Sequence, residues 1–347
     1  GTTDPRFILV PHDFDTILGQ GDTAQSTTRS IWSMIDSPAS TVANERANFL
    51  SRFMRHPEFA PIYFRLYKQH LDTTFTPEQL NPVLDEFLGY WGAVSAVPAM
   101  KSFAAARRTY VLSQIPLALT VTHSLSTQNG YLRTTTPTVT LNGLSHIIDT
   151  RRVRVSGALA TWSAWEGRWT TTATLQPGLN QVLVQSMNSN DVEFARTTLE
   201  IWYDRGAVQT VSGTIATDTA WIAETGPYSL TANLTVAAGA TLRIPAGTTL
   251  YLGSGVNLTV ANGGRLLAEG TETAPIRFTR APGTTTTWGG ITVNGGAASP
   301  ETRITHSRLE FNGSTAIHTA NGTVFLDHLT FGTTDRQYLS LDSSSFV

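Results

Sequence analysis

The chain divides into three stretches that differ in how apolar and polar residues alternate. In residues 1–116, a short apolar strand from Phe7 to Val10 precedes apolar residues that recur every three or four positions, the spacing of amphipathic helices. Pro57 separates two of these helices, and Thr76 followed by Pro77 is a typical helix start. This stretch predicts a mixed α/β, mainly helical lobe, with helices at residues 44–56, 58–71, 77–91 and 98–114.

Residues 117–205 alternate between apolar and polar positions, which is the pattern of half-buried strands. Turn signals such as Ser156-Gly157 and Pro177-Gly178 separate the runs, and short strands at this spacing predict a β-sandwich. The Trp residues fit core and strand-edge packing. For Trp162 and Trp165, which lie in a predicted loop, stacking on a sugar ring is the alternative. The predicted strands are residues 153–155, 169–175, 181–185 and 197–203.

Residues 206–347 repeat a short motif. Leu234-Thr-Val236 recurs 24 residues later as Leu258-Thr-Val260, and again as Ile291-Thr-Val293. Two further segments, 304–311 and 324–331, align at a spacing of 20 residues. Short strands that return at such a period predict stacked coils, each burying its apolar residues against its neighbours. We expect a right-handed parallel β-helix that is incomplete at its C-terminal end.

Composition narrows the functional classes. Only 14% of the residues are charged, and a formal net charge of −2 gives no basic face for nucleic acid. The absence of Cys excludes disulfides and thiolate metal sites. No apolar run is long enough to insert into a membrane. We expect an extracellular or bacterial cell-surface protein. Because both ends cut into apparent structure, we also expect an internal fragment of a larger multidomain parent.

Two carboxylates follow the first apolar strand. Asp13 and Asp15 lie at its end and lead into the glycine-rich turn Gly19-Gln-Gly21. Carboxylates held at a fixed strand end suit Mg²⁺, which also uses water and phosphate oxygens. The alternative is an Asx-type turn in which each acid accepts hydrogen bonds from nearby backbone amides. His12 beside them fits a packing role better than a ligand role.

The segment from Phe7 to Gly19 resembles the WDLDxxxG metal-binding motif of the CotH (spore-coat-H-like) protein kinase family, with His12 in place of the usual Trp. Residues 52–63, 75–80 and 103–108 are similar to that family's C-terminal helices, so the resemblance covers about residues 6–115. It implies that Asp13 is a metal ligand and Asp15 a second ligand, holding Mg²⁺ with ATP in the intact parent. The family's phosphate-anchoring Lys and catalytic Asp have no counterpart here, so we expect this fragment to be catalytically silent alone. Arg107 and Arg108 could face a phosphate, but a solvated helix face is the preferred interpretation.

Two other resemblances imply folds alone. Residues 117–204 look like an Ig-like module, and the phrases 211–215 and 236–247 resemble bacterial surface β-helix repeats. In the β-helix, the aligned register makes His306 equivalent to Leu326 and Arg308 equivalent to His328. No paired acids appear on this face, so a solvated coil surface is the preferred interpretation. The polar cluster considered there is His306, Glu310, His318, Asp327 and His328.

Three functions remain open from the sequence. The preferred one is a structural or adhesive piece of a large surface protein, able to self-assemble or to contact other parts of its parent. The second is part of a secreted, ATP- and Mg²⁺-dependent CotH-type kinase. The third is a β-helix that binds or processes a surface glycan, with Trp162 or the outer His residues as contacts.

Overall fold

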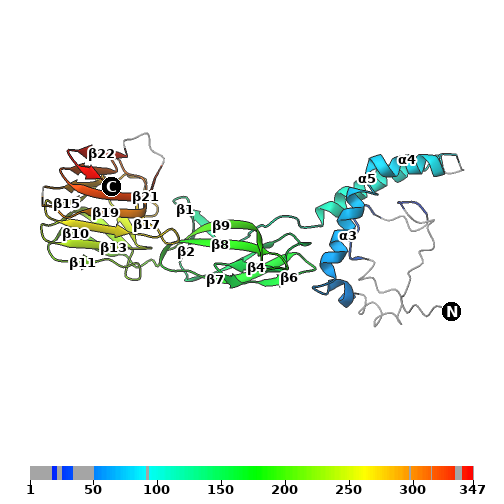
Figure 1. Cartoon of the computed structure of the whole chain (residues 1–347), viewed down its shortest axis with the longest axis horizontal. Helices are drawn as coiled ribbons and strands as arrows, with labels where there is room; N and C mark the ends of the chain where they lie inside the picture. The colour runs from blue at the N-terminus through cyan, green and yellow to red at the C-terminus, as the bar shows by residue number, and fades with distance from the viewer. Residues whose placement is uncertain are drawn as a thin grey trace.

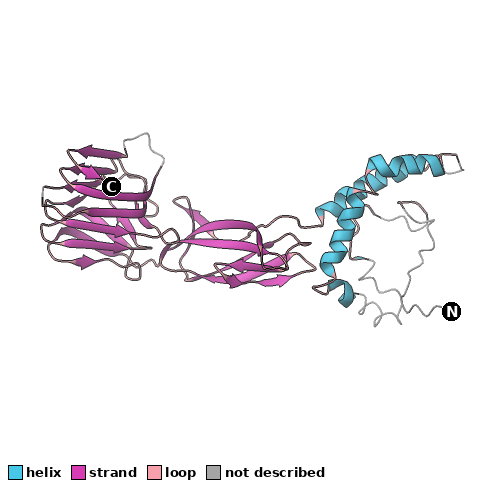
Figure 2. Ribbon diagram, viewed as in Figure 1, coloured by secondary structure: helices cyan, strands magenta, loops and turns pink. Residues whose placement is uncertain are grey.

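The computed structural model shows an elongated chain in which a small helical region, a pair of stacked sheets and a parallel β-helix follow one another (Figure 1). Helices are confined to one end, and most of the described chain is β-structure (Figure 2). Asp13 and Asp15, the strand 7–10 and most of the predicted helix 44–56 lie outside the described residues. The structure describes residues 18–21, 26–33, 51–90, 94–296, 298–313, 315–332 and 338–346.

Three helices with printed bounds form the helical region: α3 (Ala60–Asp72), α4 (Pro77–Leu88) and α5 (Val97–Ser113). Each has a proline in its first two positions, where the missing amide hydrogen costs nothing and the fixed φ suits a helix. The predicted positions of these helices are confirmed. Phe64 of α3 and Val111 of α5 pack with Ile147 from the next unit, which joins the two. Within the described part of the chain, no helix is long and apolar enough to cross a membrane.

The two-sheet unit consists of β1 to β9. A six-stranded sheet has the order β1-β2-β9-β8-β4-β5, and a three-stranded sheet has the order β3-β7-β6. All pairings are antiparallel except β2 with β9. The bounds are β1 Ser126–Gln128, β2 Tyr131–Thr134, β3 Thr138–Leu144, β4 Arg152–Val155, β5 Ala158–Leu159, β6 Thr161–Ser163, β7 Arg168–Thr174, β8 Gly178–Met187 and β9 Glu193–Tyr203.

The two sheets share one apolar core because alternate strand positions point between them. On β3, Val139 and Leu141 are buried while their Thr neighbours are exposed, and Trp169 of β7 joins them. Val184 of β8 and Ile201 of β9 supply the facing side. This is the alternation that the sequence predicts for this stretch.

The β-helix contains β10 to β23, and every strand pairing printed for it is parallel. Its strands stack into three faces. The bounds are β10 Gln209–Ile215, β11 Thr219–Ala220, β12 Tyr228–Val236, β13 Thr241–Pro245, β14 Thr249–Leu252, β15 Leu258–Val260, β16 Arg265–Glu269, β17 Ile276–Thr279, β18 Ile291–Asn294, β19 Thr302–Leu309, β20 Ile317–Ala320, β21 Thr323–Phe331, β22 Leu339–Asp342 and β23 Ser345–Phe346.

The repeat register is partly as predicted. Leu234 pairs with Leu258 and Leu258 with Ile291, so the recurring Leu-Thr-Val motif stacks in successive coils as expected. The alignment at a spacing of 20 is wrong. Ile304 pairs with Leu326, not Val324, so these two coils are 22 residues apart. A shift of two residues preserves the alternation of a strand, which is why the apolar pattern alone did not reveal it.

Long strands of the β-helix turn a corner between faces. The first part of β19 pairs with β16 and the second part with β17, with His306 between them. β21 repeats this path with His328 at the corner. The third face, defined by β14, β17 and the second half of β19, is the one that meets the two-sheet unit.

Candidate functional site

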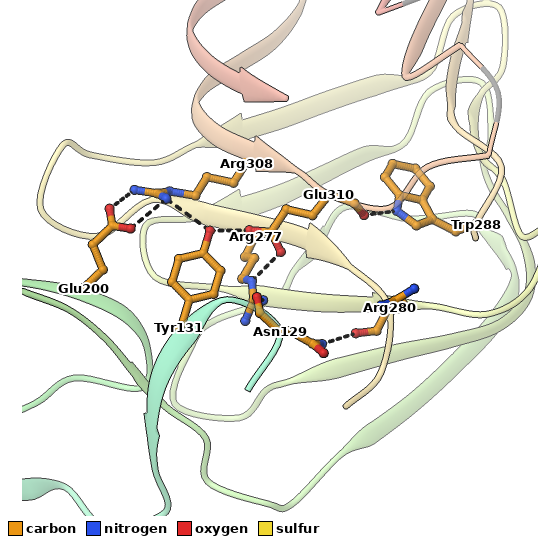
Figure 3. A network of polar contacts seen from close by, with 8 residues as sticks. All are labelled: Asn129, Tyr131, Glu200, Arg277, Arg280, Trp288, Arg308 and Glu310. Carbon is orange, nitrogen blue, oxygen red and sulfur yellow. Dashed lines mark hydrogen bonds and ion pairs between the residues drawn. The ribbon is translucent and has the colours of Figure 1, made fainter. Parts of the chain in front are cut away.

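The candidate site is the junction, where the third face of the β-helix meets strands β2, β8 and β9 of the two-sheet unit. Figure 3 shows its polar side chains converging from both sides. A backbone contact reinforces it, because the Gln181 amide of β8 donates to the Thr273 carbonyl at 3.3 Å. We define the junction network as Asn129, Tyr131, Glu200, Arg277, Arg308 and Glu310.

Arg277 lies at the centre of the junction. On β17, Ile276 and Phe278 point into the β-helix, so Arg277 points out of it, toward the two-sheet unit. That unit covers the side chain completely, leaving it 0% exposed. The guanidinium lies over the rings of Tyr131 and Trp202, 4.3 and 4.7 Å from their centroids. Burying a charge in this way is unfavourable unless it is paired.

Glu310 supplies the partner charge. Its Oε2 accepts a hydrogen bond from Arg277 Nε at 2.8 Å, and its Oε1 accepts one from the Tyr131 hydroxyl. Its backbone carbonyl accepts from Trp288 Nε1 at 2.6 Å, which ties the turn after β19 to the buried Trp288. Arg277 Nη2 also donates to the Asn129 carbonyl at 3.4 Å, whereas its Nη1 has no hydrogen-bond partner among the described residues.

Arg308 forms a second link across the junction. It lies on β19, in register with Arg277 on the preceding coil. Both of its terminal nitrogens donate to the Glu200 carboxylate of β9, with Nη1 at 3.0 Å from Oε2. Nη1 also donates to the Tyr131 hydroxyl at 3.1 Å. Such two-point Arg–carboxylate pairs fix geometry as well as contributing energy.

The charges of the junction network balance, since two guanidinium groups face two carboxylates. Both oxygens of Glu310 and both of Glu200 accept hydrogen bonds, so neither acid is left as an unpaired base. A hollow of about 260 Å³ lies beside them, lined by Tyr131, Glu200, Glu310 and neighbouring backbone. The arrangement therefore suits cohesion between the two units better than proton transfer.

Tyr131 gives the junction a pH dependence. Burial, followed by the adjacent Glu310 carboxylate, raises the pKa of Tyr131 from 10.0 to about 12. The stabilisation that comes from the protonated hydroxyl is therefore fully present below pH 10 and is lost as the pH rises through about 12. We expect melting temperatures measured between pH 9 and 12 to fall less steeply for Tyr131→Phe than for the unchanged protein. Parallel curves for the two would contradict this.

Two arginines predicted to be solvated have defined partners. Arg107 Nη1 donates to the carbonyls of Thr27, at 3.1 Å, and Arg29. Arg108 Nε donates to the Leu71 carbonyl at 2.6 Å. The interpretation as a solvated face is therefore wrong, because these side chains fasten α5 to preceding segments. The predicted metal ligands Asp13 and Asp15 lie outside the described residues.

The two loop tryptophans pack within the protein. Trp162 lies against the core of the two-sheet unit. Trp165 meets Trp32 edge-on at a centroid distance of 5.6 Å, and the Arg55 guanidinium lies 4.5 Å from its ring centroid. Trp165 thus contributes to the contact between the helical region and the two-sheet unit.

The predicted polar cluster of the β-helix is split by the structure. His306, Asp327 and His328 come together, whereas Glu310 belongs to the junction and His318 lies 3.9 Å from Asp342 on a different face. The expected equivalence of Arg308 with His328 is wrong because Arg308 pairs with Thr330. Matching His306 with His328 would have revealed the true spacing.

Sequence reasoning missed the remaining members of the junction network. One signal was present: Arg277 interrupts the apolar strand Ile276-Arg-Phe-Thr at an outward position, which hints at a covering partner. Nothing in the sequence identifies that partner as Tyr131, which lies in a different unit.

Comparison with known proteins supports the fold of the C-terminal unit. Residues 213–324 match the family described as a pectate-lyase like beta helix domain. No curated protein and no solved structure matches the chain. The matched residues cover less than half of the chain and contain Arg277, Arg308 and Glu310, so the third face of the junction belongs to a pectate-lyase-like parallel β-helix.

Proposed function

We propose that this chain is a structural or adhesive segment of a large extracellular or cell-surface bacterial protein, in which the two-sheet unit and the β-helix form one rigid body. The observation that carries the proposal is the buried junction network. Its two Arg–Glu pairs join residues far apart in the chain and leave no unpaired acid beside the hollow. A flexible tether between the units would not need such a network.

The stacking of contacts along the face supports this proposal. Tyr251 of β14 meets Trp202 at a centroid distance of 6.2 Å, Arg277 of β17 lies over the same Trp202, and Arg308 of β19 reaches Glu200. The two-sheet unit therefore contacts three successive strands of one face. Relative rotation of the two units would break several of these contacts together.

The proposal predicts a rigid particle without turnover. Small-angle X-ray scattering of the chain in solution is expected to fit the elongated arrangement of Figure 1 at both low and high salt. Assays with ATP and Mg²⁺, and with polygalacturonate, are expected to show no consumption. ATP consumption that is lost in Asp13→Ala, or cleavage of the polysaccharide, would contradict catalytic silence.

A CotH-type kinase parent is the second proposal. One observation favours a larger lobe around the helical region: Ile62 and Leu66 of α3 and Phe87 of α4 are 47, 50 and 65% exposed. Further protein packed against these side chains would remove them from water, which is favourable. In such a parent, Asp13 and Asp15 would hold Mg²⁺ with ATP. Adding upstream sequence should then produce Mg²⁺-dependent nucleotide binding that Asp13→Ala removes.

The finer identities of the two β units are also proposals. The two packed sheets with the buried Trp169 support an Ig-like module, although the parallel pairing of β2 with β9 is unusual for one. The right-handed sense of the β-helix follows from the handedness rule for parallel crossovers. Self-assembly would use the coil ends, where strands offer unpaired backbone groups. Binding of a surface glycan is the competing partner, and a glycan array tests it directly.

A further inference from the structure

Two histidines of successive coils lie one above the other at a corner of the β-helix. His306 separates the two halves of β19, and His328 separates the two halves of β21. Both have positive φ angles, 41° and 50°, so their side chains leave the backbone in a similar direction. The rings stack with centroids 4.4 Å apart and planes at 15°.

Asp327 brings a carboxylate to the same corner. Its Oδ1 lies 2.7 Å from His328 Nδ1, and this hydrogen bond lowers the pKa of Asp327 and keeps the acid ionised. One ligand atom from each of His306, Asp327 and His328 falls within 4.8 Å of the others. We call these three residues the corner trio.

The corner trio is accessible from solvent. It borders a hollow of about 310 Å³ between the corner, the loop Thr271–Pro275 and β8. His328 is 67% exposed and Asp327 45%, so a hydrated ion can approach and the side chains have room to adjust. Glu272 lines the opposite side of the hollow and adds a second carboxylate nearby.

We propose that the corner trio binds a divalent transition-metal ion, with Zn²⁺ as the reference ion. Imidazole nitrogens together with a carboxylate suit Zn²⁺, Ni²⁺ and Cu²⁺, whereas Mg²⁺ and Ca²⁺ prefer oxygen ligands alone. Tetrahedral Zn²⁺ with bonds of about 2.0–2.1 Å needs ligand atoms roughly 3.3 Å apart. The trio reaches this by drawing together by at most about 1.5 Å while the stacked rings turn toward each other. Water completes the coordination.

Isothermal titration of the tag-free full chain with zinc chloride tests the proposal. We expect one Zn²⁺ per chain, and a loss of affinity of about tenfold or more in His306→Asn or His328→Asn, because each removes an imidazole ligand. Asn tolerates the positive φ of both corners, so these variants keep the backbone. Asp327→Asn should also weaken binding.

His318→Asn is the matched control, because His318 lies in the same β-helix beside an Asp, outside the corner trio. It should bind zinc as the unchanged protein does. Nitrogen NMR of the histidine side chains adds a readout that does not depend on variants: zinc should shift His306 and His328 and leave His318 unchanged. Equal zinc affinity in the His306→Asn/His328→Asn double variant, or no uptake by the unchanged protein, would overturn the proposal.

Discussion

Replacing Glu310 by Ala should cost about 3–5 kcal/mol of junction stability, since it leaves the Arg277 guanidinium buried without its charge partner. Tyr131 also loses the acceptor of its hydroxyl hydrogen bond. The chain has several units, so a single free energy of unfolding is not well defined for it. Hydrogen exchange followed by mass spectrometry, read for peptides that cover β2 and β17, gives the local opening free energy instead.

Glu269→Ala is the matched control for this experiment. Glu269 pairs with Arg303 at 3.3 Å on the same β-helix, but its side chain is 49% exposed. Exposed pairs of this kind are worth only about 0–1 kcal/mol. The double variant Arg277→Met/Glu310→Met should recover most of the loss, because it removes both buried charges. Exchange in Glu310→Ala that matches Glu269→Ala would contradict the structural role of the network.

Gly178→Ala should separate the two β units at their backbone contact. Gly178 begins β8 with φ of 95°, and a Cβ built there overlaps the carbonyl oxygen of Gly247 in the β-helix. The left-handed conformation alone costs about 1–2 kcal/mol for a residue with a side chain, and the overlap adds to it. Because the overlapping atom belongs to the backbone, relief requires movement of one unit away from the other. Faster hydrogen exchange in β8 and in the turn around Gly247 is the expected measurement.

Gly157→Ala separates the two contributions. Gly157 lies in the β4–β5 turn with φ of 84°, and nothing lies within 4 Å of a Cβ added there. This variant therefore carries the conformational cost without the overlap. The difference between the two variants measures the contact with Gly247. If both variants destabilise their surroundings equally, the close approach at Gly178 has no energetic consequence.

The local elements were largely predictable because they follow from periodicity. The helices that begin at Pro77 and near Pro98 and the stacked motif of Leu234 and Leu258 all depend on spacings within one segment. The register of the later coils was not predictable from apolar spacing. An error of two residues leaves every buried position of Ile304 and its neighbours apolar.

The junction network could not be predicted for a different reason. Tyr131 and Glu310 are 179 residues apart, and their contact depends on how two separately folded units dock. Single-residue patterns carry no information about that docking. The corner trio was closer to reach, since His306 and His328 stand out as a recurring rare residue, but only the spacing of 22 places them together.

The two-sheet unit attaches to the side of the coil stack, through Tyr251, Arg277 and Arg308, and not to either of its ends (Figure 1). Gene duplication that inserted or removed a coil beyond these strands would leave the attachment untouched. The length of the β-helix can therefore vary during evolution while its connection to the rest of the protein stays constant.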